Sequence, residues 1–417
     1  MSTTNTPEPD RLARLNELLA RVVATNTFQQ PRIPQLPLRS LDELAQIPFA
    51  SKEMLVADQE AHPPIGTNLS YPVDEFTQLH QTSGSRGPVL RVMNTSEDWA
   101  WWRRCMATVL RAAGIGPGDR VALAYSFGPY ILFWASYEGV EEVGAAGLAL
   151  GGMDSQQRLH ALRAYEITTV MCTPTYAVHL AQVAAQHGRL DAFETVDQII
   201  CSGEPGASIP AVRARIETAW NARCLDHAGL SEVGPAGYPC AEGGGVHILE
   251  EEFIAEIIDP ASGAPAEDGQ VGELVLTALG RVGSPAIRYR TGDVVDRHDG
   301  PCPAGHRGRW LPRGVLARSD DMVVIRGMNV FPSAIEQTMR ETADIGEFRI
   351  TFYTETTEMD EVKVEVELDR AADVRAIQTN LRQQLGLRVR IVPLKPGILP
   401  SSTDKARRVV DLRSLER

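Results

Sequence analysis

Short apolar segments alternate with segments of helical periodicity between residues 97 and 219. The apolar segments lie at 121–125, 145–150, 168–172 and 198–201, and the helical segments at 97–114, 155–164, 177–186 and 211–219. A strand followed by a helix, repeated several times, is typical of a parallel sheet with helices packed on it. The chain up to about residue 240 is therefore predicted to have an α/β fold.

The flanking parts of the sequence have other patterns. Residues 10–25 predict a helix, and the Pro-rich stretch 28–80 is expected to be a lead-in. Polar and apolar residues alternate in the segments 251–259, 272–279, 321–327, 348–355 and 361–368, which predicts antiparallel strands with one covered face. A helix is expected at 371–385 and a strand at 388–392.

The length of 417 residues is too great for one ordinary core. We therefore expect two domains. The first, residues 1–318, is predicted to be a large α/β domain with several sheets, and the second, residues 319–417, a small α+β domain.

The charge balance excludes two kinds of partner. The chain has 54 acidic and 41 basic residues and a net charge of −13, whereas nucleic acids and anionic membranes require a broad basic face. The uncharged apolar stretch 121–137 has 17 residues and falls short of the roughly 20 that a spanning helix needs. The N-terminus lacks the pattern of a secretion signal, so a cytoplasmic location is expected.

The segment TSGSRGP at 82–88 has the composition of a phosphate-binding loop. Its glycines let backbone N–H groups turn toward an anion, its hydroxyls add donors, and Arg86 offsets negative charge. The segment lacks the Gly-Lys-Ser/Thr ending of a P-loop ATPase, which disfavours that class. Taken alone, it is equally compatible with a Ser- and Gly-rich surface turn.

Further strings follow in a fixed order: SGEPG at 202–206, HAGLSE at 227–232, YRTGD at 289–293, RSDDMVVIRGMNVFP at 318–332 and LPSSTDKARRVVD at 399–411. With the segment 82–88, they closely resemble the adenylate-forming superfamily, which contains acyl-CoA synthetases, the adenylation domains of peptide synthetases and luciferases. Four segments are most similar to the phenylacetate-CoA ligase group: GLSE, HILEEEFIAEIIDP, SDDMVVIRGMNVFPSAIE and KARRVVD. The resemblance covers about residues 80–411.

This resemblance implies an enzyme that activates a carboxylic acid with ATP as its acyl-AMP and then transfers the acyl group to coenzyme A. It also implies which residues contact the nucleotide. Those over the β- and γ-phosphates would be Thr82, Ser83, Gly84, Ser85, Arg86 and Gly87. Those at the adenine would be Gly203, Glu204, Pro205, Asp226, His227, Ala228 and Gly229, and those at the ribose Asp293 and Arg318.

The resemblance assigns the chemistry to three residues. Ser231 would contact the α-phosphate, and Glu232 would hold Mg²⁺, a hard ion that suits a carboxylate and phosphate oxygens. Lys405 would place a compact positive charge on the α-phosphate and the substrate carboxylate while negative charge builds there. Residues 319–417 would be a mobile lid with its hinge at Asp320, so that each half-reaction meets different groups.

The sequence departs from the pattern of the resembling family at three positions. Pro88 follows Gly87 directly where a Lys is usual, so that Arg86 is the cation of the phosphate loop. Ala228 replaces the Tyr that stacks on adenine, and Ala317 replaces the Gly before Arg318. The replacement of the Tyr weakens the adenine assignment, although His227 beside it could compensate.

Two cysteines and two histidines have the spacing of a zinc site. Cys240 and His247 lie seven positions apart, and Cys302 and His306 four apart, in stretches bounded by turn residues. Two thiolates and two imidazoles can complete a tetrahedral, structural Zn²⁺ site. The resembling group has a second Cys where this chain has Ala304, and His306 is therefore the substitute ligand that we predict. The alternative is that these side chains hold no metal.

The acid pocket and the acceptor are the least constrained features. Tyr125, Phe127 and Tyr130 fall where the resembling ligases place an aromatic wall, and Gly128 between them is also assigned to the acid pocket. Gly152, Ala228 and Gly229 would leave room for a flat ring. Simple core packing is the alternative for these residues. A small aryl acid is the expected substrate. The acceptor could also be a carrier-protein phosphopantetheine or an amine instead of CoA. In a different class of function, the same scaffold could act as a nucleotide sensor without catalysis. The chain could also form a homodimer.

Overall fold

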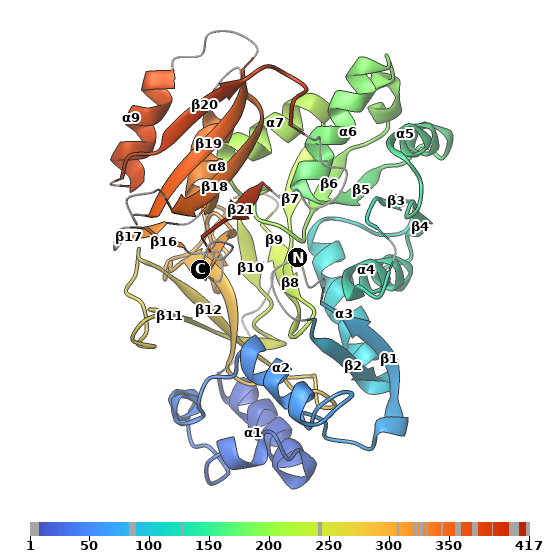
Figure 1. Cartoon of the computed structure of the whole chain (residues 1–417). Coiled ribbons are helices and arrows are strands. Elements are labelled where there is room, and N and C mark those ends of the chain that lie inside the picture. The colour runs from blue at the N-terminus through green and yellow to red at the C-terminus, as the bar shows by residue number, and fades with distance from the viewer. Residues whose placement is uncertain are drawn as a thin grey trace.

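The computed structural model describes residues 8–82, 89–126, 128–240, 244–306, 308–319, 323–325, 328–330, 332–342, 345–354, 360–368, 374–385, 387–399 and 408–413. In Figure 1, the N-terminal helices lie at the bottom, the parallel sheet with its helices at the right and the C-terminal sheet at the upper left. The mixed α/β class with several sheets, a large N-terminal domain and a C-terminal domain is confirmed.

The N-terminal stretch is a packed part of the large domain. It contains α1 (Glu8–Thr25), α2 (Lys52–Ala61) and short 3-10 helices at Gln30–Arg32, Leu41–Gln46 and Val73–Glu75. Leu15 and Leu19 of α1 share a buried cluster with Ile254 and Ile287 from much later in the chain. The stretch predicted as a lead-in is therefore ordered, because the apolar face of α1 covers that later part.

The predicted parallel sheet is confirmed. Its strands are β3 (Arg120–Leu123), β4 (Ala146–Ala149), β5 (Thr169–Cys172), β6 (Gln198–Cys201) and β7 (Arg223–Asp226), in the order β4-β3-β5-β6-β7. On one face Val121 and Leu123 pack against α3 (Ser96–Ala112) and α4 (Ile131–Glu142). On the other face Ala122 and its neighbours pack against α5 (Ser155–Ala164), α6 (Pro174–Gln186) and α7 (Pro210–Trp220), beside a 3-10 helix at Leu190–Phe193.

Two antiparallel sheets and a hairpin complete the large domain. One sheet contains β8 (Ala228–Leu230), β9 (Gly234–Pro239), β10 (Val246–Ile248) and β14 (Trp310–Leu311). The other contains β11 (Phe253–Ile258), β12 (Val271–Ala278), β13 (Tyr289–Asp296) and β15 (Val315–Arg318), and the hairpin pairs β1 (Phe76–Gln81) with β2 (Arg91–Thr95). Residues of α3, of the parallel sheet and of both antiparallel sheets form one core.

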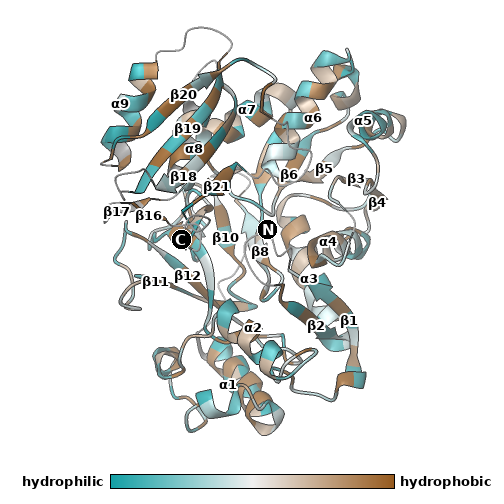
Figure 2. Ribbon diagram, in the orientation of Figure 1, coloured by the Kyte–Doolittle hydropathy of each residue, from teal (hydrophilic) through white to brown (hydrophobic). Residues whose placement is uncertain are grey.

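The C-terminal unit has a core of its own. It contains the hairpin β16 (Val323–Ile325) and β17 (Met328–Val330), the helices α8 (Pro332–Glu341) and α9 (Val374–Leu385), and a sheet of β20 (Arg390–Leu394), β19 (Asp360–Leu368), β18 (Ile345–Thr354) and β21 (Val409–Asp411). Figure 2 shows hydrophilic and hydrophobic residues alternating along these strands. Ile350, Phe352 and Val364 are fully buried in its core. The domain boundary between residues 318 and 319 stays a prediction.

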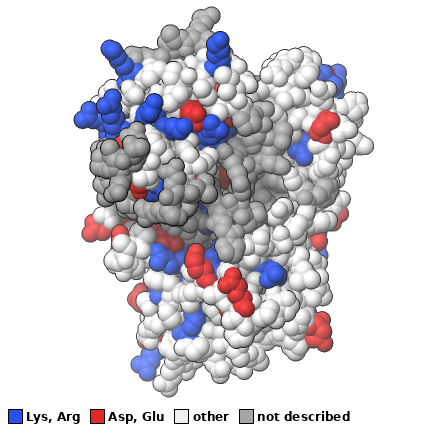
Figure 3. Space-filling model, viewed as in Figure 1, with Lys and Arg blue, Asp and Glu red and all other residues white. Residues whose placement is uncertain are grey.

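The surface charge is unevenly distributed. In the view of Figure 3, Lys and Arg side chains gather over the C-terminal unit, where Arg375, Arg382, Arg388, Arg390 and Lys395 are exposed. Among the described helices, none is both long and apolar enough to cross a membrane.

Candidate active site

The carboxyl ends of two neighbouring parallel strands carry the predicted adenine residues. β6 ends at Cys201 and leads into Gly203–Pro205, and β7 ends at Asp226 and leads into His227 and β8. Cys201 and Asp226 are partners in the register of the two strands. Ligands of open α/β sheets bind outside the carboxyl ends of the strands. The structure thus brings these predicted residues together at the edge where a nucleotide is expected.

Glu204 uses its carboxylate within the protein. The carboxylate accepts a hydrogen bond of 2.7 Å from the backbone N–H of Thr175, in the first turn of α6. A negative charge at this position also interacts favourably with the helix dipole. The side chain of Glu204 therefore fixes the loop that follows β6, and a contact with adenine would involve the backbone of that loop.

Asp226 and His227 are buried polar neighbours. Ser208 donates a hydrogen bond of 2.6 Å to Asp226, and burial raises the pKa of Asp226 to about 6. Nδ1 of His227 lies 2.6 Å from the carbonyl oxygen of Gly237, and burial lowers the pKa of His227 to about 4. Because a carbonyl oxygen only accepts, Nδ1 carries the proton and Nε2 is the acceptor. Near pH 7 a neutral imidazole therefore stands beside a carboxylate.

The predicted acid-pocket residues are partly dispersed. Tyr125 is buried in the core of the large domain, and its hydroxyl lies 2.6 Å from that of Ser202. Tyr130 is 37% exposed, beside Gly128, whose φ of +154° is one that residues with a side chain rarely adopt. Gly229 lies so close to β9 that an added Cβ would be 2.9 Å from the carbonyl oxygen of Gly234.

Gly152 follows β4 in a turn with a φ of +83°, and an added Cβ there would meet no atom within 4 Å. Ala228, in contrast, is held in β8 opposite Gly237 of β9. The aromatic wall and the small-residue floor stay predictions.

Asp293 and Arg318 form an ion pair between adjacent strands. They are partners in the register of β13 and β15, and Nη1 of Arg318 donates a hydrogen bond of 3.0 Å to Oδ1 of Asp293. Gly292 before Asp293 has a φ of +73°, and an added Cβ would lie 2.8 Å from the guanidinium. The left-handed backbone therefore favours glycine at this position of YRTGD, and the guanidinium of Arg318 lies close to it. The two residues predicted to contact the ribose lie side by side.

The base of the predicted phosphate loop is closed. Thr82 donates its backbone N–H to the carbonyl oxygen of Leu90 at 3.0 Å, and its hydroxyl accepts a hydrogen bond from the N–H of Leu90, also at 3.0 Å. The two ends of the intervening segment are thus held together. Several predicted site residues lie outside the described residues: Ser83, Gly84, Ser85, Arg86, Gly87, Phe127, Asp320 and Lys405.

Ser231 and Glu232 occupy the turn between β8 and β9. Two residues beside this turn were not assigned a role from the sequence. Arg281 donates to the carbonyl oxygens of both Ser231 and Glu232, and Tyr289 lies near the carboxylate of Glu232. Tyr289 belongs to the YRTGD string, so a signal was present for it. Arg281 lies in no recognised string, and its role depends on contacts that only the fold creates.

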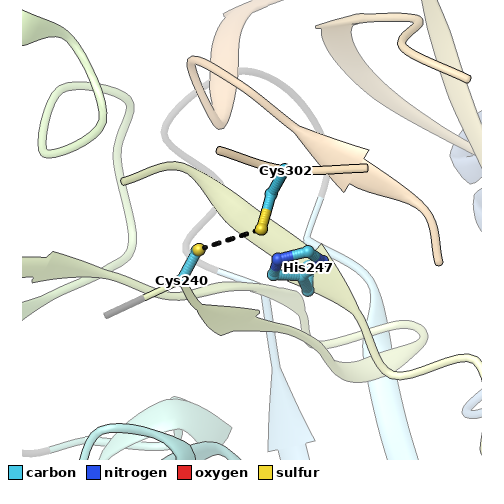
Figure 4. A group of neighbouring side chains, drawn as sticks. All are labelled: Cys240, His247 and Cys302. Carbon is cyan, nitrogen blue, oxygen red and sulfur yellow. Dashed lines mark hydrogen bonds between the residues drawn. The ribbon is translucent and has the colours of Figure 1, made fainter. Parts of the chain in front are cut away.

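Cys240, His247 and Cys302 form a buried cluster (Figure 4). Their ligand atoms all lie within 4.8 Å of one another, and the two sulfur atoms are 3.7 Å apart. Neither ring nitrogen of His247 has a hydrogen-bond partner among the described residues, although the residue is only 2% exposed. Buried polar atoms are normally paired, and a cation would supply the missing partner. The donor set of two thiols and one imidazole fits Zn²⁺.

His306 lies near this cluster without belonging to it. Its ring centroid is 6.0 Å from that of His247, and its carbonyl oxygen accepts a hydrogen bond of 3.0 Å from the N–H of Cys302. The predicted fourth ligand is therefore beside the other three, in the same turn as Cys302. Its coordination of a metal stays a prediction.

Comparisons with known proteins agree with these observations. Residues 327–413 match the family described as the AMP-binding enzyme C-terminal domain. A phenylacetate-coenzyme A ligase of Pseudomonas putida is 30% identical over 391 residues, which cover 90% of this chain and 86% of that protein.

A solved structure of a 2-hydroxyisobutyryl-CoA ligase, in the postadenylation state with R3-HIB-AMP, matches with a TM-score of 0.89 and 28% identity over 99% of this chain and 91% of the other. The same ligase with 2-HIB-AMP and CoA in the thioesterification state matches with a TM-score of 0.72 and 29% identity over 99% and 92%. The chain belongs to the phenylacetate-CoA ligase family of AMP-forming acid–thiol ligases.

Proposed function

We propose that the protein joins a small aryl carboxylic acid to coenzyme A in two steps at one site. In the first step, a carboxylate oxygen attacks the α-phosphorus of ATP and pyrophosphate leaves. In the second step, the thiol of CoA loses its proton and attacks the acyl carbon, and AMP leaves. The observation that carries the proposal is the likeness, over 99% of the chain, to a CoA ligase in complex with an acyl adenylate.

Specific residues have proposed roles in the first step. Asp293, held by Arg318, would accept hydrogen bonds from the ribose hydroxyls, because a carboxylate can take two neighbouring donors. Ser231 would contact the α-phosphate, and Glu232 would hold Mg²⁺. The cation would offset the charge of the phosphate oxygens, and Lys405 would stabilise the charge that develops in the transition state.

Two orientations of the C-terminal unit are part of the proposal. The same relative matches with a TM-score of 0.89 in its postadenylation state and 0.72 in its thioesterification state, at nearly equal identity and coverage. This difference favours an arrangement like that after adenylation for the present structure. We propose that residues 319–417 then turn about Asp320 to admit the thiol.

An aryl acid is the proposed substrate because the small residues Gly152, Ala228 and Gly229 would leave room for a flat ring, and because a 30% identical relative is a phenylacetate-coenzyme A ligase. We expect kcat/KM to be at least about tenfold higher for benzoate-type or arylacetate acids than for unbranched acids of eight to sixteen carbons. Pyrophosphate release and CoA thioester formation measured across such a panel test both steps together. A higher kcat/KM for the alkyl acids would contradict the proposed aryl pocket but not the proposed adenylation chemistry.

His227 refines the choice of substrate. Its neutral ring offers Nε2 as an acceptor, so a hydroxyl or amino substituent could donate to it. The panel therefore includes ring-hydroxylated acids and small hydroxyalkanoic acids such as 2-hydroxyisobutyrate. Preference for the hydroxyalkanoic acids would replace the aryl proposal. Acid-dependent pyrophosphate release without a thioester would point to a carrier protein or an amine as acceptor, and its absence with every acid would favour a nucleotide sensor.

A structural Zn²⁺ held by Cys240, His247 and Cys302, with His306 as fourth ligand, is also proposed. It would pin the β9–β10 connection to the loop before β14. Because four protein ligands leave no open position, the ion would stabilise the fold and take no part in the reaction. A cytoplasmic location and a homodimer complete the proposal.

Elemental analysis of protein purified without chelator is expected to find about one zinc per chain. Cys302→Ser should abolish zinc retention and lower Tm by roughly 5–10 °C, with a smaller effect on kcat. Cys224→Ser is the matched control, because Cys224 is equally buried but lies outside the cluster. It should lower Tm and keep the zinc. Metal-free wild-type protein would contradict the site.

A further inference from the structure

Arg281 is a buried cation in the connection between β12 and β13. It is 1% exposed and lies between two glycines that approach α3 closely. A Cβ on Gly280 would be 2.2 Å from the indole of Trp101, and one on Gly283 would be 2.2 Å from Asp98. Asp98 also accepts hydrogen bonds from the N–H groups of Val282 and Gly283. The backbone that carries Arg281 is therefore fixed on both sides.

The guanidinium bridges two segments of the candidate active site. Nη1 donates to the carbonyl oxygens of Ser231, at 3.4 Å, and Glu232, and Nη2 donates to that of Met93, at 3.4 Å. Ser231 and Glu232 form the turn between β8 and β9, whereas Met93 belongs to β2, the strand that follows the predicted phosphate loop. The fork of Arg donors suits such a bridge, which a single ammonium cannot reproduce.

The burial of the Arg281 guanidinium is energetically unfavourable, and stability alone does not explain it. In the described part of the chain, Arg281 has no carboxylate within ion-pair distance, and its Nε has no hydrogen-bond partner. Burying a charge without an ion pair is unfavourable, and an apolar residue often serves stability equally well. The opposite charges of Asp98 and Glu232 act on it only from a distance. The arrangement is better explained by what it positions.

The carboxylate of Glu232 has a polar neighbour other than Arg281. Tyr289, which is 2% exposed, lies close enough to that carboxylate to interact with it electrostatically. Glu232, Arg281 and Tyr289 all line one pocket, which Met93 and Arg91 also reach. Arg281 thus fixes the backbone of the turn, and Tyr289 lies near the end of the Glu232 side chain.

We infer that Arg281 is a positioning residue that sets the metal affinity of Glu232 by fixing the Ser231–Glu232 turn relative to β2. The inference rests on the proposed function, because it takes Glu232 as the ligand of the Mg²⁺ that accompanies ATP. Groups that orient a metal ligand typically change metal affinity or activity about 10–100-fold when removed. The hydrogen bonds of Arg281 all go to backbone carbonyl oxygens, so its effect would pass through the turn.

The test compares Arg281→Lys with the wild-type protein in the acid-dependent release of pyrophosphate. We expect the Mg²⁺ concentration for half-maximal rate to rise at least about tenfold, with most of kcat restored at saturating Mg²⁺ and with KM for the acid little changed. Arg288→Lys is the matched control. Arg288 is a buried guanidinium in the same connection that donates to the carbonyl oxygens of Ala45 and Ile47 and pairs with Glu256. Its replacement should lower Tm without changing the Mg²⁺ requirement.

A second variant and a binding measurement keep the inference open to refutation. Arg281→Met removes the charge as well as the fork, and electron paramagnetic resonance of Mn²⁺ with ATP measures metal binding without turnover. Unchanged Mn²⁺–ATP affinity in both Arg281 variants, or an equal change in Arg288→Lys, would overturn the inference. A wild-type protein that binds Mn²⁺–ATP but releases no pyrophosphate with any acid would instead refute the proposed function.

Discussion

Replacement of Lys405 by alanine is expected to lower the rate of adenylate formation by about 10²- to 10³-fold, while thioester formation from a synthetic acyl adenylate and CoA is largely retained. The physical reason is the charge that builds on the α-phosphate as the carboxylate attacks. A compact ammonium stabilises that charge more in the transition state than in the ground state, and only such differential interactions raise the rate. In the second half-reaction the adenylate is already formed, and the lid would have carried Lys405 away from it.

The experiment measures each half-reaction separately. Acid-dependent pyrophosphate exchange reports the first step, and consumption of synthetic acyl-AMP by CoA reports the second. Lys395→Ala is the control, because Lys395 is an exposed lysine of the same C-terminal unit. An equal loss of both half-reactions in Lys405→Ala would contradict the assignment. The segment that carries Lys405 begins after Leu399, whose N–H donates to Glu367, and ends before Arg408, whose carbonyl oxygen accepts from Ile350 of β18.

The sequence was sufficient where periodicity and residue type agree. The strands predicted at 168–172 and 198–201 and the helix predicted at 155–164 match β5, β6 and α5 closely. β9 was missed because its sequence, GPAGYP, contains the residues least typical of strands. All six of its residues are buried, and its glycines are required by packing, since a Cβ on Gly237 would lie 2.5 Å from Val246. Tertiary contacts therefore override local propensity there.

The residues of the candidate site likewise include some that the sequence predicts and some that only the fold reveals. Cys240, His247 and Cys302 were found from their spacing, because metal ligands must be of a few residue types that stand out in loops. Asp293 and Arg318 were found through strings that resemble a family. Arg281 was not, because an arginine among ordinary loop residues gives no sign of burial. Its three carbonyl partners come from segments 49 to 188 positions away, which only the fold brings together.

Asp98→Ala should lower the free energy of unfolding of the large domain by about 3–5 kcal/mol. Asp98 is fully buried and accepts four hydrogen bonds. Two come from the N–H and hydroxyl of Thr95 at the start of α3, and two from the N–H groups of Val282 and Gly283. Alanine leaves these donors buried without an acceptor, and each unsatisfied donor is costly. Asp98→Asn should also destabilise, because the amide nitrogen would face donors on one side.

Asp154→Ala is the control that separates the effect of helix capping on stability from the effect of burial. Asp154 forms the same kind of capping box at the start of α5 but is exposed, so its loss should cost only about 1 kcal/mol. Unfolding by urea is followed by tryptophan fluorescence, which reports the large domain because all six tryptophans precede residue 319. If Asp98→Ala lowers the free energy of unfolding no more than Asp154→Ala does, the hydrogen bonds from Val282 and Gly283 to Asp98 contribute nothing to stability. Since Asp98 holds the loop that carries Arg281, the folded Asp98→Ala protein should also require more Mg²⁺, whereas Asp154→Ala should not.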